Sequence, residues 1–294
     1  MKYTVKNDEI TVAFNTFGGE LSSIKDSGGL EYLWQGDKEY WSGRAPALFP
    51  IVGGLRNKRA VIGGDKTCCM ERHGVVRKLE FDLEEITDDS ITFSVCSNEQ
   101  TMERYPYHFK FMIQYQLNGK DLTTKYTVIN KNDIVMPFQI GGHPAFNCPL
   151  SRGEHFEDYV VEFDQAETAD CPTPVPSTGL VDVAKRTRML NNERVLTMNH
   201  DLFKVDAVIF DGLKSRKAKL YNPKTGRGVL SSFADFNNLL VWSSPNGGPF
   251  VALEPWSGLS TCSDESDIFE EKRGVYLLPA GESKSFSFTI TVLN

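Results

Sequence analysis

The sequence predicts an all-β protein, an antiparallel sandwich or barrel with few short helices. Short segments that alternate polar and apolar residues recur along almost the whole chain, and a period of two is typical of strands with one buried face. Turn residues separate these segments at the spacing of hairpins. Strands do not alternate with helical segments, which argues against a parallel α/β sheet.

Three hairpins and a terminal strand follow from this pattern. The strongest signal is Asn118-Gly119, because Asn-Gly between two alternating runs favours a tight hairpin turn. Asn7-Asp8 and Asp88-Asp89 separate two further pairs of runs in the same way. The predicted strands are residues 3–5 and 10–14, 81–86 and 91–95, 111–117 and 122–129, and the C-terminal run 286–292.

Two segments predict short helices, and a third is irregular. Thr101–Tyr105 can form one or two turns before Pro106 stops a helix. Ser263–Glu271 carries acidic residues early, as the first turn of a helix often does. Asp164–Thr187 contains a cluster of prolines and predicts a long surface excursion, because strand-like sequence continues on both sides. No change of composition marks a linker, so residues 1–294 are predicted to form one β domain.

The composition is that of a globular protein able to bury a large core. The chain has 294 residues, of which 40% are hydrophobic and 24% charged, and this mixture excludes a mostly disordered chain. The formal net charge is −7 and no basic run is present, so neither nucleic acid nor a membrane surface is expected as a partner. No stretch approaches the ~18 apolar residues of a membrane span, and the N-terminal residues do not have the pattern of a secretory signal.

The cysteines and histidines do not predict a metal centre. Cys68 and Cys69 are adjacent, and no two of the six cysteines have the C-x-x-C spacing, which is a poor start for a disulfide framework or a zinc site. We therefore expect reduced thiols in a cytoplasmic protein. The five histidines lack the H-x-H and H-x-x-x-H spacings of metal ligands, so no metal is expected.

Two candidate site residues are weakly marked by their neighbours. Arg56 follows an apolar run that ends in Gly53-Gly54, and glycines allow a backbone to approach a ligand closely. A surface ion pair explains Arg56 equally well. His73 precedes Gly74 at a chain bend, where a loop histidine bonded to backbone is the simpler interpretation.

Two further candidates are more strongly marked. His143 follows two glycines and precedes Pro144, and a rigid backbone suits an aimed catalytic side chain, although an incidental histidine in a rigid turn explains the same sequence. Glu254 ends an apolar run, where burial would raise its pKa toward the range of a general base; the alternative is a carboxylate turned to solvent. Trp242 and Trp256 lie on either side of this run and offer flat faces to a sugar ring, although packing in a core is the commoner use of tryptophan.

Taken in order, these motifs resemble the aldose 1-epimerase (galactose mutarotase) family, in particular its shorter LacX-like branch. The resemblance extends over nearly the whole chain and implies a large antiparallel β-supersandwich that needs no cofactor. The matching segments are residues 48–56, 72–74, 142–147, 202–210 and 254–259.

The resemblance also implies roles for individual residues. His143 matches the catalytic acid of the family, and Glu254 matches the catalytic base. Arg56, His73 and Asp206 match residues that contact the sugar.

The implied reaction interconverts the α and β anomers of an aldohexose by acid–base opening of the ring. His143 would have to be protonated, with a pKa raised by a nearby carboxylate such as Glu254 or Asp206. Gly142 and Ala145 differ from the residues usual in the galactose-specific branch, so the identity of the sugar is open. A hexose-6-phosphate 1-epimerase and a non-catalytic carbohydrate-binding protein on the same fold are the alternatives. The expected partner is a small-molecule sugar, and the oligomeric state is open.

Overall fold

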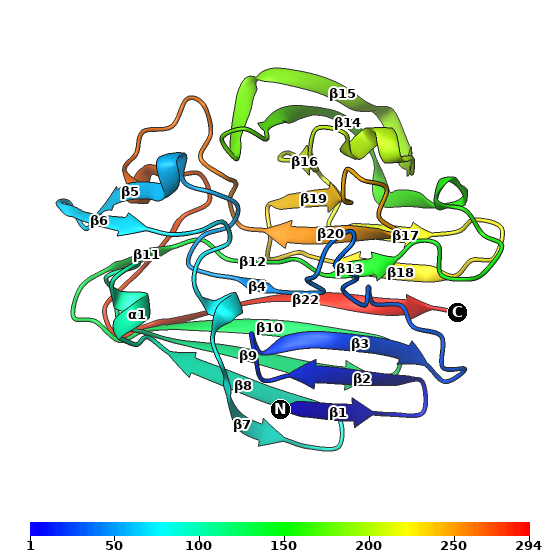
Figure 1. The fold of residues 1–294 in the computed structure, drawn as a ribbon, viewed down its shortest axis with the longest axis horizontal. Coiled ribbons are helices and arrows are strands. Elements are labelled where there is room, and N and C mark those ends of the chain that lie inside the picture. The colour runs from blue at the N-terminus through cyan, green and yellow to red at the C-terminus, as the bar shows by residue number, and fades with distance from the viewer.

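The computed structural model describes residues 1–294 and consists mainly of antiparallel strands (Figure 1). The largest sheet has nine strands, in the spatial order β15 (Leu180–Thr197), β14 (Val160–Val175), β17 (Lys217–Tyr221), β18 (Gly228–Ser232), β22 (Ser283–Leu293), β10 (Asp121–Asn130), β9 (Phe109–Asn118), β8 (Ser90–Cys96) and β7 (Asp82–Ile86). A six-stranded sheet contains β16 (Val208–Phe210), β19 (Asn238–Trp242), β20 (Phe250–Trp256), β12 (Gly141–Gly142) and β4 (Ala47–Leu48), with β13 (Ala145–Asn147) paired to β20. Three small sheets contain β1 (Lys2–Lys6), β2 (Ile10–Asn15) and β3 (Glu20–Asp26); β5 (Arg59–Ile62) and β6 (Lys66–Cys69); and β11 (Met136–Phe138) and β21 (Tyr276–Leu278). The all-β prediction is confirmed.

The predicted hairpins are present, with one shift of register. Asn118 of β9 pairs with Asp121 of β10, so the turn is Gly119-Lys120, one residue later than the Asn-Gly signal. Gly119 has a φ of +57°, which glycine accepts without strain. Side chains along β9 and β10 alternate between buried and less buried, as the alternating sequence predicts.

Helices are confined to one α-helical turn and five 3-10 turns. The α-helix α1 (Glu99–Met102) begins two residues before the predicted start, because the Asn98 side chain accepts a hydrogen bond of 3.0 Å from the Thr101 N–H and caps the turn. The 3-10 turns are η1 (Arg56–Lys58), η2 (Val76–Lys78), η3 (Phe156–Asp158), η4 (His200–Phe203) and η5 (Phe269–Glu271).

The predicted helix over Ser263–Glu271 is wrong, since only η5 at its end is helical. The carboxylate of Glu265 accepts hydrogen bonds from the N–H groups of Cys262, at 2.9 Å, and Arg273, at 2.8 Å. The Glu265 side chain thus binds the backbone N–H groups at both ends of residues 262–273. These bonds hold the segment as a loop, because a side chain that binds backbone donors competes with helix formation.

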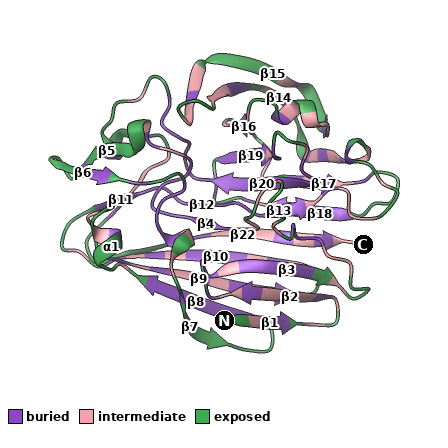
Figure 2. Cartoon of the chain, in the orientation of Figure 1, coloured by how far each residue is buried: buried purple, intermediate pink, exposed green.

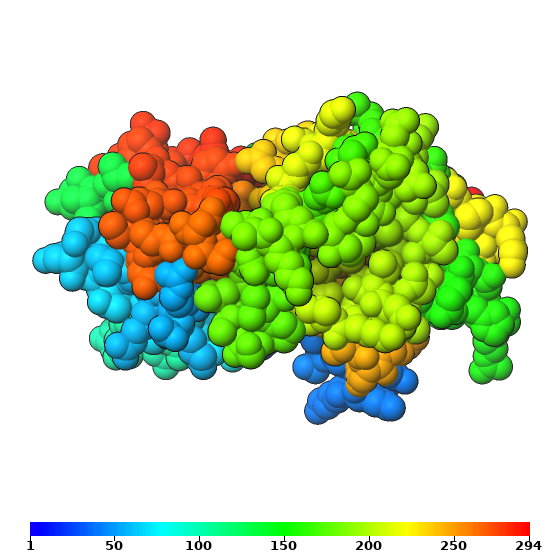
Figure 3. All heavy atoms as spheres, turned by 90° about the horizontal axis from the view of Figure 1, so that it is seen from above, coloured from blue at the N-terminus to red at the C-terminus, as the bar shows by residue number.

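The proline-rich segment Asp164–Thr187 is not an irregular excursion but most of a long hairpin between β14 and β15. Four register shifts interrupt its pairing. β14 pairs with β17 only over Val160–Phe163, so the prolines that follow lie where β14 has a hydrogen-bonded partner on one side alone. A residue without an N–H is tolerated at such an edge, and the green hairpin covers the centre of the face seen in Figure 3.

The nine-stranded and six-stranded sheets pack face to face around the main core. A cluster of 65 buried hydrophobic residues extends from Val5 to Val292, and buried residues are concentrated in the strands of both sheets (Figure 2). At Gly142 of β12, an added Cβ would lie 2.9 Å from the ring of Phe288 on β22. The two sheets are therefore in close contact beside the segment that carries His143.

Candidate active site

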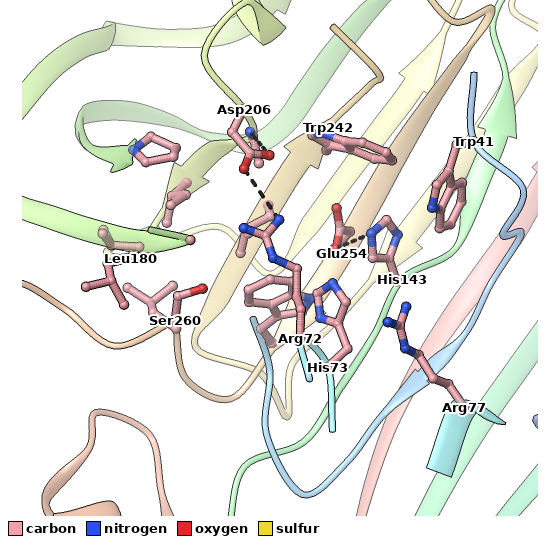
Figure 4. A pocket seen from close by; sticks show the side chains of 18 residues that line it. Trp41, Arg72, His73, Arg77, His143, Leu180, Asp206, Trp242, Glu254 and Ser260 are labelled. Carbon is pink, nitrogen blue, oxygen red and sulfur yellow. Dashed lines mark hydrogen bonds and ion pairs between the residues drawn. The ribbon is translucent and has the colours of Figure 1, made fainter. Parts of the chain in front are cut away.

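One cavity gathers most of the polar residues that the sequence singled out. Its volume is about 210 Å³, and nine of its 18 lining residues are hydrophobic. Strands β19 and β20, the turn before η2, the segment between β12 and β13 and the tip of the β14–β15 hairpin form its walls (Figure 4). Of the predicted residues, His73, His143, Asp206, Trp242 and Glu254 line this cavity, and Arg56 does not.

Glu254 and His143 are in direct contact on the cavity wall. Glu254 lies on β20, all seven residues of which are buried, and its Oε2 is 3.2 Å from Nε2 of His143 (Figure 4). Their side chains are only 2% and 8% exposed. The Leu253 N–H donates a hydrogen bond of 3.1 Å to the Pro144 carbonyl. Leu253 precedes Glu254 and Pro144 follows His143, so this backbone hydrogen bond holds the two side chains close together.

Two glycines allow His143 to reach this place. An added Cβ at Gly141 would lie 2.9 Å from the Pro255 carbonyl oxygen, and one at Gly142 would meet the Phe288 ring at the same distance. Such contacts are too short for real side chains, so the Gly-Gly-His sequence reflects a chain that passes between β20 and β22 with no room for a Cβ.

Burial controls the protonation of the pair. It raises the pKa of Glu254 well above the ordinary value of 4.5, and the negative charge of Asp206 adds to this effect. Burial also lowers the pKa of His143 from 6.5 to about 3, and the positive charges of Arg77 and Arg72 act in the same direction. The prediction that a carboxylate raises the pKa of His143 is therefore wrong, because burial and the charges of Arg77 and Arg72 lower it. Both shifts favour the uncharged forms, a protonated Glu254 beside a neutral His143, and protons held by two such close groups belong to the pair.

His73 is held as a neutral imidazole with a defined tautomer. Its φ of +72° is uncommon for a residue other than glycine, and reciprocal bonds maintain it. The His73 N–H donates to the Gly53 carbonyl at 2.7 Å, and the Gly53 N–H donates to Nδ1 of His73 at 3.2 Å. Since Nδ1 accepts a hydrogen bond, the proton lies on Nε2, and burial together with the charge of His143 keeps the pKa of His73 well below 6.5. His73 is thus a hydrogen-bond donor beside the pair.

Asp206 and Arg72 form the more open side of the cavity. Their ion pair measures 3.5 Å between Nη1 and Oδ2, with side chains 45% and 21% exposed for Arg72 and Asp206 (Figure 4). One Asp206 oxygen also accepts the N–H of Ala207 at 2.9 Å. Trp242, at the end of β19, faces the cavity across from Arg72. A polar pair opposite an aromatic ring can bind hydroxyl groups on one side of a ligand and its C–H face on the other.

Arg56 is the one predicted residue that the structure takes out of the site. Its guanidinium forms an ion pair of 2.6 Å with Asp267 and donates to the carbonyls of Cys262 and Glu265. Each of these acceptors belongs to the loop of residues 262–267, so Arg56 braces that loop. The expectation that Arg56 contacts a sugar is corrected to this role, and the guanidinium groups that do line the cavity belong to Arg72 and Arg77.

Sequence reasoning missed Trp41 and Ser260 as cavity residues. Trp41 lies in a segment without strand or helix and has no motif around it, so nothing in the sequence marks it. Ser260 accepts the Gly54 N–H at 2.9 Å, a contact between segments about 200 positions apart that sequence spacing does not reveal.

The fold and the site together define the class of protein: the chain belongs to the aldose 1-epimerase family, whose family model matches residues 1–291. It is 48% identical over 300 aligned positions to the plasmid-encoded protein LacX of Lactococcus lactis subsp. lactis, with both chains covered completely.

Solved structures agree with this assignment. The galactose mutarotase related enzyme from Lactobacillus acidophilus has a TM-score of 0.93 at 32% identity, covering 99% of this chain and 97% of that one. A galactose mutarotase-like protein from Lactobacillus casei has a TM-score of 0.90 at 28% identity, with both chains covered completely. The predicted family and the predicted galactose mutarotase-like β-supersandwich are confirmed.

Two further observations concern metals and membranes. The side chains of His, Cys, Asp and Glu do not come together in any group of three or more that could hold a metal ion. None of the helices has the length and apolar character needed to cross a membrane.

Proposed function

We propose that the protein is an aldose 1-epimerase that interconverts the α and β anomers of an aldohexose, with Glu254 as base and His143 as acid. The observation that carries the proposal is the buried pair itself, 3.2 Å between Nε2 and Oε2, on the wall of a cavity of about 210 Å³. Drug-sized ligands occupy pockets of roughly 300–1,000 Å³, so a smaller cavity favours one sugar ring over an oligosaccharide. Family membership supports a sugar as the substrate.

The reaction follows from a pair that holds one proton. In the productive form His143 carries the proton on Nε2 and Glu254 is ionised. Glu254 accepts the proton of the anomeric hydroxyl while His143 donates its proton to the ring oxygen, and the C1–O5 bond breaks to give an aldehyde and a free C5 hydroxyl. The pair still holds one proton, now on Glu254. Rotation about C1–C2 and the reverse transfers then close the ring as the other anomer.

Burial has two effects on this cycle. It disfavours the ionised productive form in the empty cavity, because it raises the pKa of Glu254 and lowers that of His143. Both ends of the proton's path are shielded from solvent, so the proton moves between sugar and protein without exchange with bulk water. His73 offers its Nε2–H beside the pair, and Asp206 and Arg72 offer partners for the hydroxyls at the open side. General acid–base catalysis by two placed groups contributes about 10²–10⁴-fold for each, which suits a reaction that already proceeds slowly in water.

A hexose-6-phosphate 1-epimerase is the second candidate, because one observation favours it. Two guanidinium groups, of Arg72 and Arg77, line the same cavity, and the buried Nε of Arg77 has no hydrogen-bond partner. Guanidinium groups bind phosphate through charge-assisted bonds. A non-catalytic binding protein is less well supported. Burying an ionisable carboxylate costs free energy of folding, and a protein that only binds sugar has no need of a buried acid–base pair.

Polarimetry distinguishes these functions. The pure α anomers of glucose, galactose and their 6-phosphates are dissolved with and without protein, and the spontaneous rate is subtracted. We expect the protein to accelerate the change in rotation for at least one of the free hexoses. Acceleration confined to the 6-phosphates would support the second candidate, and no acceleration with any of the four, despite measurable binding, would support the binding protein. A cytoplasmic location stays a prediction, with which the six free cysteines agree.

A further inference from the structure

The imidazole of His143 lies flat against the indole of Trp41. Their ring centroids are 4.6 Å apart and their planes differ by 22°. Trp242 stands perpendicular to both rings, with centroids 5.4 Å from His143 and 5.4 Å from Trp41. Figure 4 shows the three rings side by side on the wall of the cavity. One face of the imidazole is therefore covered by an aromatic surface.

Hydrogen bonds do not fix the plane of this imidazole. The buried Nδ1 of His143 has no hydrogen-bond partner, whereas catalytic histidines are usually oriented by a bond at the nitrogen that does not react. The other nitrogen, Nε2, lies 3.2 Å from Oε2 of Glu254, and under the proposed function a bound sugar interposes its oxygens there. The ring contacts with Trp41, Trp242 and His73 remain when the sugar is bound, and of these three rings Trp41 is the one that lies flat against the imidazole.

The segment that carries Trp41 is fastened to the strand of the catalytic base. The Trp34 indole N–H donates to the Trp41 carbonyl at 2.8 Å, and the Trp34 ring packs on Phe250 of β20 with centroids 4.8 Å apart. The Asn246 side chain donates to the Glu39 carbonyl at 2.8 Å. In Figure 3 the blue segment that contains residues 37–42 projects at the lower edge beside the orange turn that contains Asn246. Both fastenings therefore lead to residues at or next to the strand that carries Glu254.

Gly43 provides the space for the indole. An added Cβ at this position would lie 2.5 Å from the Trp41 ring, a distance that real Cβ atoms do not adopt. The φ of Gly43 is not in the left-handed region, so the requirement for glycine at this position is one of space alone. Gly43→Ala therefore displaces the indole without changing any residue that touches His143.

We propose that Trp41 is a positioning residue for His143: its flat face holds the imidazole plane so that Nε2 points at Glu254 and at the ring oxygen of the sugar. The kinetic consequence rests on the proposed function, whereas the stacking contact itself does not. The charged and titratable groups around His143 are Glu254, His73, Arg72 and Arg77. None of these side chains is altered by a substitution at Trp41, and Trp41→Phe keeps an aromatic ring over His143.

The first test compares Trp41→Leu, which removes the flat face, with Trp41→Phe, which keeps one. We expect Trp41→Leu to lower kcat by between about 10-fold and 10²-fold, since a misplacement near 1 Å costs up to 10²-fold, with little change in KM. Trp41→Phe should recover most of kcat. Gly43→Ala should lower kcat in the same way, and Gly212→Ala is its matched control, because an added Cβ at Gly212 has no neighbour within 4 Å. An unchanged kcat in Trp41→Leu, a change in KM alone, or equal losses in the Leu and Phe variants would each overturn the proposal.

The second test does not depend on activity. Protein with isotopically labelled histidine gives ring-proton NMR signals, and His143→Asn identifies those of His143. A stacked indole shifts these signals upfield by its ring current, so the shift should vanish in Trp41→Leu and persist in Trp41→Phe. If the wild-type protein leaves every sugar unchanged yet shows this pattern, the proposed function fails and the stacking contact stands. If the wild-type protein is active and the His143 signals do not respond to Trp41→Leu, the positioning role is refuted.

Discussion

Replacing Glu254 by Gln should abolish mutarotation and, at neutral pH, stabilise the fold. The carboxyl and amide groups have nearly the same shape, so the Gln side chain can keep the place of Glu254, 3.2 Å from Nε2 of His143. Gln cannot accept the anomeric proton, so we expect kcat to fall by about 10²–10⁴-fold. The effect on stability follows from the pKa of Glu254, which burial holds well above 4.5 in the folded protein.

The effect on stability depends on pH. Between the unfolded pKa near 4.5 and the higher folded pKa, the unfolded chain has released a proton that the folded protein keeps. Rising pH therefore favours unfolding of the wild type, by about 1.4 kcal/mol per pH unit for one proton. The Gln variant has no such group. The free energy of unfolding of Glu254→Gln minus that of the wild type should thus increase by about 1.4 kcal/mol per pH unit between the unfolded and the folded pKa of Glu254, and level off above the folded pKa.

Urea denaturation at pH 5, 6, 7 and 8, followed by tryptophan fluorescence, measures this difference. Glu103→Gln, which removes an exposed carboxylate, is the control for the loss of one carboxylate as such. A difference in unfolding free energy that stays constant from pH 5 to pH 8 would refute the reasoning. It would mean that Glu254 releases its proton in the folded protein at the same pH as in the unfolded chain, and that the pair does not retain a proton.

Three further predictions concern His143, Arg56 and the removal of metal ions. His143→Asn should lower kcat by about 10²–10⁴-fold with little change in sugar affinity, and a rise in KM at unchanged kcat, measured by steady-state kinetics, would make His143 a binding residue. Arg56→Ala should leave KM and kcat unchanged and lower the free energy of unfolding by about 1 kcal/mol, because its ion pair with Asp267 is half exposed; a large rise in KM would return Arg56 to the sugar site. Dialysis against EDTA should leave the rate of mutarotation unchanged, and loss of activity that one divalent ion restores would contradict the proposed mechanism.

The hairpins were predictable because their information is local. Along β9 and β10 the alternation of side chains and the turn residues lie within about 20 positions of sequence, and strand pairing followed them to within one residue. The hairpin of β14 and β15 was not predictable, because its prolines argue against strands. They are tolerated there only because β17 does not extend alongside them, and this is a property of the sheet and not of the segment.

The candidate site divides in the same way. Glu254 and His143 were marked by apolar or glycine-rich neighbours, which reflect close packing of the backbone around them. Arg56 was marked by similar neighbours and lies elsewhere, because the sequence does not show that the loop of residues 262–267 supplies its acceptors. Trp41 was unmarked, since its contact with His143 joins two segments that are far apart in the chain. The direction of the His143 pKa also required the structure, because the extent of burial decides it.

The most direct test of the central claim is exchange NMR on an equilibrium mixture of sugar anomers. At neutral pH the wild-type protein should produce exchange cross-peaks between the H1 signals of the α and β anomers of glucose or galactose, at a concentration of protein at which sugar alone gives none. The same spectra with Glu254→Gln, checked to be folded by its fluorescence, should lack these cross-peaks. Wild-type protein without cross-peaks for either sugar or its 6-phosphate, or cross-peaks of equal strength with the Gln variant, would contradict the assignment of this buried pair to anomer exchange.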